Sequence, residues 1–163
     1  MPFAQIKRHT QRDPLIPIIV SSIVTSALVV YPLSYEVSGW RPLFMLLTML
    51  FWVIGQPTWC GVWFAFGMGI FTDLLTDAPL GMNALIFVLI AFVARYFTRE
   101  RRVMTFLNMW VIAALAVVAH LFLVWLAQLF TSTQFSVARH WQPLLSSIAV
   151  FPVLYYLLKK WRI

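Results

Sequence analysis

The sequence predicts an all-α polytopic membrane protein in which six transmembrane helices form one compact bundle. Of its 163 residues, 62% are hydrophobic and only 10% are charged, and the mean hydropathy is +0.87. A soluble domain of this size is roughly half apolar and about a quarter charged. The apolar residues form six runs, and short basic clusters separate them. This placement of charge is typical of membrane topology and gives no reason to expect a nucleic-acid partner.

The chain begins with a polar, basic segment over residues 1–13, and one membrane domain is predicted over 14–160. The first apolar run, 14–33, has the charge flank of a secretory signal. However, it is about as long as a full membrane span, and no A-x-A-like cleavage site follows it. We therefore predict an uncleaved first helix.

The second and third helices are predicted to be short. The run 41–56 provides about 24 Å of helix, less than a hydrocarbon core of about 30 Å, and the third helix, 58–75, is little longer. The turn between them carries no charge. These helices form a short hairpin that either spans a thinned bilayer or is re-entrant and covered by its neighbours.

Three further helices complete the predicted bundle. The fourth helix is expected over 81–98, after a turn rich in helix-breaking residues. The fifth apolar run, 103–130, is longer than a perpendicular span requires, which indicates a tilt. The last helix is expected over 141–158, and residues 161–163 form a basic cytoplasmic tail.

The basic residues predict the orientation of the bundle. If the N-terminus is cytoplasmic, ten of the twelve Lys and Arg residues fall on the cytoplasmic side, and only Arg41 and Arg139 fall outside. The positive-inside rule applies to short loops of this kind. Both termini are therefore predicted to be cytoplasmic, in a multi-pass protein of a cytoplasmic membrane.

A stripe of small residues marks the third helix. Gly61, Ala65 and Gly69 stand four residues apart, and Asp73 follows at the same spacing. Positions i and i+4 share one face of a helix. Small side chains on that face let a second helix approach closely, so these residues are predicted to form a helix-packing groove.

Asp73 has two interpretations. A carboxylate at a helix end can reach interfacial water, or it can be buried with a cation or backbone N–H groups as its partner. The stripe directs Asp73 inward, and Arg41 is the candidate cation because it is predicted to lie near the same outer face. We predict a structural carboxylate that ties the third helix to Arg41 or to the turn 77–81.

The sequence predicts no catalytic site, metal site or cofactor. It lacks P-loop, HExxH and GxSxG motifs, and its single cysteine, Cys60, has no ligand spacing. Asp73 and Asp77 lie on one helix, whereas membrane aspartyl proteases use facing aspartates from two helices. His120 is either a proton-relay group or a neutral histidine that hydrogen-bonds across helices. The basic cluster 95–102 is either a topology signal or a contact for anionic lipid or an acidic partner.

The motifs between residues 41 and 81 together resemble the MreD family, the rod shape-determining proteins of bacterial inner membranes. An Arg-Pro pair opens the second helix, and a Phe-Trp pair lies near its end. A Gly-x-x-x-Asp-Leu motif lies on the third helix, and a Pro-Leu-Gly turn opens the fourth. The residues concerned are Arg41, Pro42, Phe51, Trp52, Gly69, Asp73, Leu74, Pro79, Leu80 and Gly81. The length, the six-span layout and the basic C-terminus also agree with the family.

This resemblance implies a non-catalytic scaffold or regulatory subunit of the cell-elongation machinery, which synthesises lateral peptidoglycan. The direct partner it implies is a bitopic MreC-like protein. An MreB-like filament and a complex of RodA with a class B penicillin-binding protein are the implied indirect partners. Membrane lipid surrounds such a bundle, and a homo-oligomer is compatible with it.

The same resemblance provides an alternative function. MreD-like proteins resemble, in fold, the S-components of energy-coupling-factor transporters, which are membrane-embedded subunits that bind small molecules. A pocket of that kind needs several convergent polar groups, and the apolar runs of this chain offer few. The scaffold is therefore the preferred interpretation.

Overall fold

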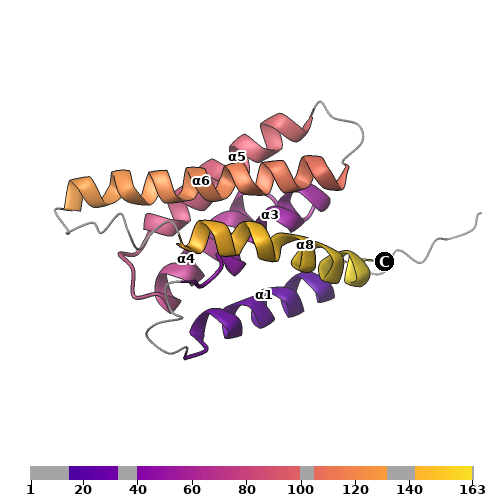
Figure 1. The fold of residues 1–163 in the computed structure, drawn as a ribbon, viewed down its shortest axis with the longest axis horizontal. Coiled ribbons are helices and arrows are strands. Elements are labelled where there is room, and N and C mark those ends of the chain that lie inside the picture. Colours follow the sequence, from indigo (N-terminus) through magenta and orange to yellow (C-terminus); the bar gives the residue numbers. More distant parts are fainter. Residues whose placement is uncertain (1–14, 33–39, 100–104, 132–141, 163) are drawn as a thin grey trace, which may run out of the picture.

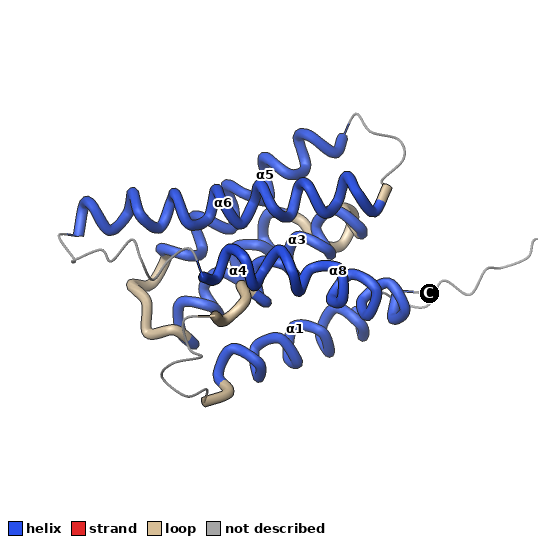
Figure 2. Tube along the Cα trace, viewed as in Figure 1, coloured by secondary structure: helices blue, strands red, loops and turns tan. Residues whose placement is uncertain are grey.

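The computed structural model describes residues 15–32, 40–99, 105–131 and 142–162. These ranges contain six helices and no strand (Figures 1 and 2), which confirms the all-α prediction for the described residues. The helices are α1 (Leu15–Val30), α3 (Phe44–Gly55), α4 (Val62–Leu75), α5 (Met82–Arg99), α6 (Phe106–Thr131) and α8 (Gln142–Arg162). The N-terminal segment 1–13, Arg139 and residues 100–102 of the basic cluster lie outside the described residues. Residues 161 and 162, expected in a tail, belong to α8.

Three of the six helices are long and apolar enough to cross a membrane, over 82–99, 106–129 and 142–160. The other three, α1, α3 and α4, have 16, 12 and 14 residues. They measure about 24, 18 and 21 Å at the rise of an α-helix. Six transmembrane helices were predicted, and three of the six described helices are long enough to span; α3 and α4 are short, as predicted for the hairpin, and α1 is shorter than predicted. α1 ends earlier than the apolar run 14–33 because Pro32 disfavours helical geometry at Tyr31.

Both helices of the α3–α4 hairpin begin later in the sequence than predicted. Arg41 and Pro42 precede α3, which begins at Phe44. After α3 the chain turns, and the backbone N–H groups of Trp59 and Cys60 donate to the carbonyl of Gln56 at 3.2 and 2.9 Å. Gly61 is extended, so α4 begins only at Val62.

Helix α3 occupies the centre of the bundle. It contacts the five other described helices, and nine of its twelve residues are buried. A helix that is hydrophobic on all sides belongs in an interior. The neighbours therefore cover α3, as one of the two interpretations of the hairpin requires. α4 differs, because only four of its fourteen residues are buried and Trp63 is 86% exposed.

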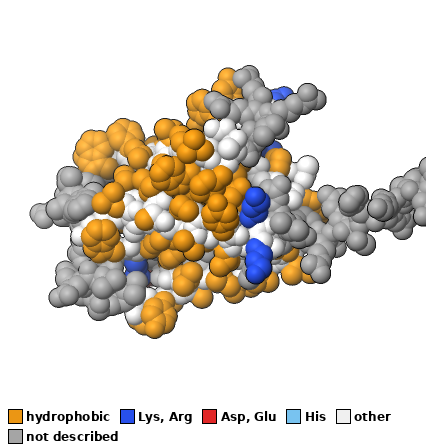
Figure 3. Space-filling view, turned by 45° about the vertical axis from the view of Figure 1, so that its right-hand side comes forward, with side chains coloured by type: hydrophobic (Ala, Val, Ile, Leu, Met, Phe, Trp, Pro, Cys, Tyr) orange, Lys and Arg blue, Asp and Glu red, His pale blue; other side chains and the backbone are white. Residues whose placement is uncertain are grey.

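The remaining helices surround α3. α6 packs against both α5 and α8, and α1 packs against α3, α4 and α8. Figure 1 shows α6 and α8 running along the long axis, with α1 on the far side of α8 from α6. The face shown in Figure 3 is largely hydrophobic, and large apolar side chains are exposed on all of the outer helices, as a bilayer-facing surface requires.

Candidate functional site

The predicted packing stripe on α4 faces α5. Ala65 and Gly69 are both buried. A Cβ atom added at Gly69 would lie 2.7 Å from the backbone N of Ala84 and 2.9 Å from the backbone O of Asn83. The two helices thus meet backbone to backbone at this point, which only glycine at position 69 allows. Gly61 has another position: it is the extended residue before α4 and lies beside the Arg95 side chain.

Asp73 ends this stripe and caps the next helix. Its side chain is 1% exposed. Oδ2 accepts a hydrogen bond from the backbone N–H of Gly81 at 2.8 Å, and Oδ1 accepts one from Asn83 at 2.9 Å. α5 begins at Met82, so these N–H groups belong to a helix start, where they have no partner within the helix. The negative charge also interacts favourably with the positive end of the helix dipole.

The main chain of Asp73 helps to end its own helix. Its carbonyl accepts a hydrogen bond from the N–H of Ala78 at 3.1 Å. Asp77, which lies between them, has a left-handed backbone with φ of 51°. The bond from Ala78 to Asp73 is therefore the one that spans six residues in a Schellman motif. Gly81 has φ of 96°, a conformation that favours glycine.

The other residues of the predicted turn motif have two different roles: Pro79 closes the turn, and Leu74 and Leu80 lie on the surface. The carbonyl of Pro79 accepts a hydrogen bond from the N–H of Met82 at 3.1 Å, which closes the turn onto α5. Leu74 and Leu80 are both exposed. These two leucines therefore contribute apolar outer surface, and the capping is done by the backbone and by Asp73.

Arg41 does not form an ion pair with Asp73. Its Nη1 and Nη2 donate to the carbonyls of Val29 and Tyr31 at 3.0 and 2.9 Å. These carbonyls lie at the C-terminal end of α1, where backbone acceptors lack helical partners and a cation is favoured. Arg41 Nε is buried and has no hydrogen-bond partner among the described residues. The two residues therefore cap two different helices, because each is satisfied by backbone groups closer to it.

Three hydrogen bonds that involve serine or tryptophan side chains link different helices and were not predicted from the sequence. The backbone N–H of Leu43, just before α3, donates to Ser147 Oγ of α8 at 2.8 Å. Trp52 Nε1 of α3 donates to Ser21 Oγ of α1 at 2.9 Å. Trp110 Nε1 of α6 donates to the carbonyl of Ile148 in α8 at 3.2 Å. Two of these bonds could have been anticipated from the tryptophans, since an indole N–H inside a bundle needs an acceptor.

His120 is buried in α6, and its ring lies 5.8 Å from that of Phe87. Its Nδ1 and the hydroxyl of Thr48 have no hydrogen-bond partner among the described residues. Cys60 lies in the α3–α4 turn, where burial raises the pKa of its thiol to about 11. No group of three metal-ligating side chains occurs in the part of the chain that the structure describes.

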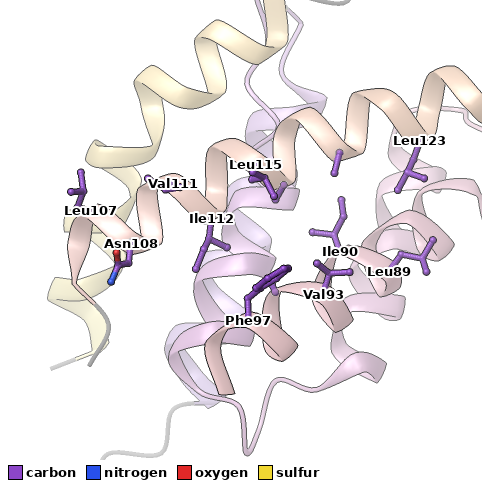
Figure 4. Close-up of a pocket in the computed structure, with 13 residues that line it drawn as sticks. Leu89, Ile90, Val93, Phe97, Leu107, Asn108, Val111, Ile112, Leu115 and Leu123 are labelled. Carbon is purple, nitrogen blue, oxygen red and sulfur yellow. The ribbon is translucent and has the colours of Figure 1, made fainter. Parts of the chain in front are cut away.

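A groove of about 430 Å³ lies between α5 and α6 and is open on one side. Figure 4 shows its lining, with Leu107 and Asn108 at one end and Leu123 at the other. Asn108 is the single polar side chain among the lining residues, and three alanines, Ala94, Ala116 and Ala119, line the groove as well. This composition suits an apolar helix or an acyl chain better than a polar ligand.

Comparison with known families identifies the chain. Residues 10–161, nearly the whole sequence, match the family model described as rod shape-determining protein MreD. No solved structure matches the chain. The matched region contains all the motifs between residues 41 and 81 on which the resemblance rested, including Asp73 and the Pro-Leu-Gly turn. The chain belongs to the MreD family of rod shape-determining membrane proteins.

Proposed function

We propose that this protein is a non-catalytic scaffold or regulatory subunit of the bacterial cell-elongation machinery that acts through helix packing with a bitopic MreC-like partner. Membership of the MreD family supports a role in rod shape determination. The observation that carries the more specific proposal is the use of the interior polar side chains. Among the described residues, Asp73, Arg41, Ser147 and Trp52 use their side-chain hydrogen bonds to fix helix ends or to join neighbouring helices.

Four polar side chains support the scaffold proposal through their hydrogen bonds. Asp73 caps the start of α5, and Arg41 caps the end of α1. Ser147 joins α8 to the start of α3, and the Trp52 indole joins α3 to α1. A catalytic or small-molecule site needs polar groups that converge on one cavity. Polar groups that fix helix ends instead give a bundle with a defined outer surface, which is what a packing partner requires.

We place the partner's transmembrane segment in the groove between α5 and α6. The groove is concave and apolar, and alanines line it at Ala94, Ala116 and Ala119. Small residues let two helices approach closely within a membrane. Exposed side chains from both helices, such as Val93 of α5 and Leu115 of α6, offer contact on both sides of an inserted helix.

Cysteine cross-linking tests this placement. Leu115→Cys in a Cys60→Ala background is expected to cross-link to cysteines placed along the transmembrane segment of the MreC-like partner. Trp63→Cys, on the exposed side of α4, is the control and is expected to give no adduct. Adducts of equal yield at both positions would remove the groove as the contact. Failure of the partner to co-purify with the unmodified protein from native membranes would contradict the scaffold proposal itself.

A further inference from the structure

A second cavity lies where the C-terminal end of α5 meets the α3–α4 turn. It has a volume of about 700 Å³. Pro57 of the turn and Val62 at the start of α4 form one side, and Arg95 and Arg99 of α5 contribute to the other. It is separate from the α5–α6 groove, because different residues of α5 line the two.

The two arginines in this cavity have no counter-ion among the described residues. Arg95 and Arg99 are one helical turn apart, and like charges at that spacing destabilise a helix. The described carboxylates are those of Asp73 and Asp77, both at the opposite end of α5, and no ion pair joins them to an arginine. The charge at this end of the bundle is therefore unbalanced within the described structure.

The hydrogen bonds of these arginines leave most of their donors unused. Arg95 Nη2 donates to the carbonyl of Pro57 at 3.3 Å, a long bond. A guanidinium has five N–H donors, and Arg99 makes no hydrogen bond to another described residue. The start of α4 is adjacent: Gly61 lies against Arg95 Nη1, and no side chain caps this helix. Uncapped N–H groups at a helix start add to the preference of the arginines for an anion.

We propose that this cavity binds the phosphate headgroup of an anionic phospholipid, with Arg95 and Arg99 as its ligands. The rest of the lining favours a lipid over a free anion. Phe92 and Tyr96 extend outward from α5 beside the arginines, and Tyr96 is 71% exposed. α5 is long enough to cross the membrane, so its basic end lies at headgroup level and these aromatic rings face the acyl region. Basic pockets between transmembrane helices are suited to such headgroups. This inference does not depend on the proposed partner.

Native mass spectrometry of the full-length protein tests the proposal. The protein in detergent is titrated with phosphatidylglycerol and, separately, with phosphatidylcholine. Arg95→Gln with Arg99→Gln is expected to weaken phosphatidylglycerol binding at least about tenfold, because the phosphate loses its charge-assisted hydrogen bonds from both guanidinium groups. The control is Lys159→Gln with Lys160→Gln, which removes the same charge from two exposed lysines at the end of α8. That variant is expected to bind within about threefold of the unmodified protein, since few ordinary surface charges affect a specific site strongly.

Two further measurements distinguish the loss of charge from misfolding of the variant, and binding of a lipid from binding of free phosphate. Arg95→Lys with Arg99→Lys keeps both charges and is expected to retain most of the binding. Equal losses in the arginine and lysine control variants, or equal binding of phosphatidylcholine, would overturn the proposal. So would displacement of the lipid by millimolar inorganic phosphate, because the site would then be one for a free anion.

Discussion

The carboxylate of Asp73, in the last turn of α4, accepts a hydrogen bond of 2.8 Å from the backbone N–H of Gly81, which lies immediately before α5. A second bond from Asn83 at 2.9 Å completes the cap. One residue therefore fixes two helix termini: its side chain caps the start of α5, and its main-chain carbonyl accepts the hydrogen bond that ends α4. Because the same helices touch backbone to backbone at Gly69, the α4–α5 unit depends on two features that can be tested separately.

Asp73→Asn is expected to destabilise the protein by about 1–3 kcal/mol. An amide offers one acceptor oxygen where the carboxylate offers two, so one backbone N–H at the start of α5 is left buried and unbonded. Unfolding of the purified protein, followed by circular dichroism, measures the loss. Asp77→Asn is the matched control: Asp77 is exposed and has a left-handed backbone that asparagine also adopts. A change within about 0.5 kcal/mol is expected there, and equal effects of the two variants would refute the capping role.

Gly69→Ala is expected to disrupt the α4–α5 contact. The added methyl group would collide with the backbone of Ala84 and Asn83, and overpacking of this kind typically costs about 1–3 kcal/mol. Gly67→Ala is the control, because a Cβ there meets nothing within 4 Å. It is expected to stabilise the protein by up to about 1 kcal/mol, since alanine is a better helix former than glycine. Similar thermal stability of the two variants would show that the close approach at Gly69 is unimportant.

Arg41 and Asp73 are expected to contribute to stability independently. They share no partner, because one caps α1 and the other caps α5. In a double-mutant cycle with Arg41→Gln and Asp73→Asn, the coupling is expected to be below about 0.5 kcal/mol. The charge swap Arg41→Asp with Asp73→Arg is likewise expected to recover nothing. Recovery of folded protein by the swap would instead reveal a direct ion pair.

The Cys60 thiol is expected to react slowly with maleimide in the folded protein. Burial raises its pKa to about 11, and only the thiolate is nucleophilic. At pH 9, two units below that pKa, about 1% of the thiol is ionised. The labelling rate should thus keep rising above pH 9 and increase sharply on unfolding. Trp59→Cys in a Cys60→Ser background provides the comparison, because position 59 is 56% exposed and should label quickly. A Cys60 rate that levels off near pH 9 would contradict this.

The proposed orientation predicts where reporters are active. A reporter that works only in the periplasm should give no signal when it is fused after Ile163. Inserted near Ser136, between α6 and α8 in the sequence, it should give a strong signal. Each expectation follows from the ten-to-two distribution of basic residues. The reverse pattern would require the opposite orientation of the whole bundle.

The sequence by itself determined which segments are helical and which face of α4 is buried. Apolar runs and breaker residues depend on local backbone chemistry, so the turn that contains Pro79 and Gly81 marks the start of α5 to within a residue or two. The four-residue spacing of Ala65, Gly69 and Asp73 fixes one face of a helix whatever surrounds it. For that reason the burial of these residues could be predicted without knowing their neighbour.

Only the tertiary structure decided which groups meet. A buried carboxylate needs hydrogen-bond donors. From the sequence alone, the Arg41 side chain and the backbone N–H groups of α5 are equally good candidates. The position of α5 against Gly69 selects the backbone. Ser147 and Leu43 are 104 residues apart, and no local pattern records such a contact. Periodicity shows that a face is covered but not what covers it, because the covering helix is chosen by the packing of the whole bundle.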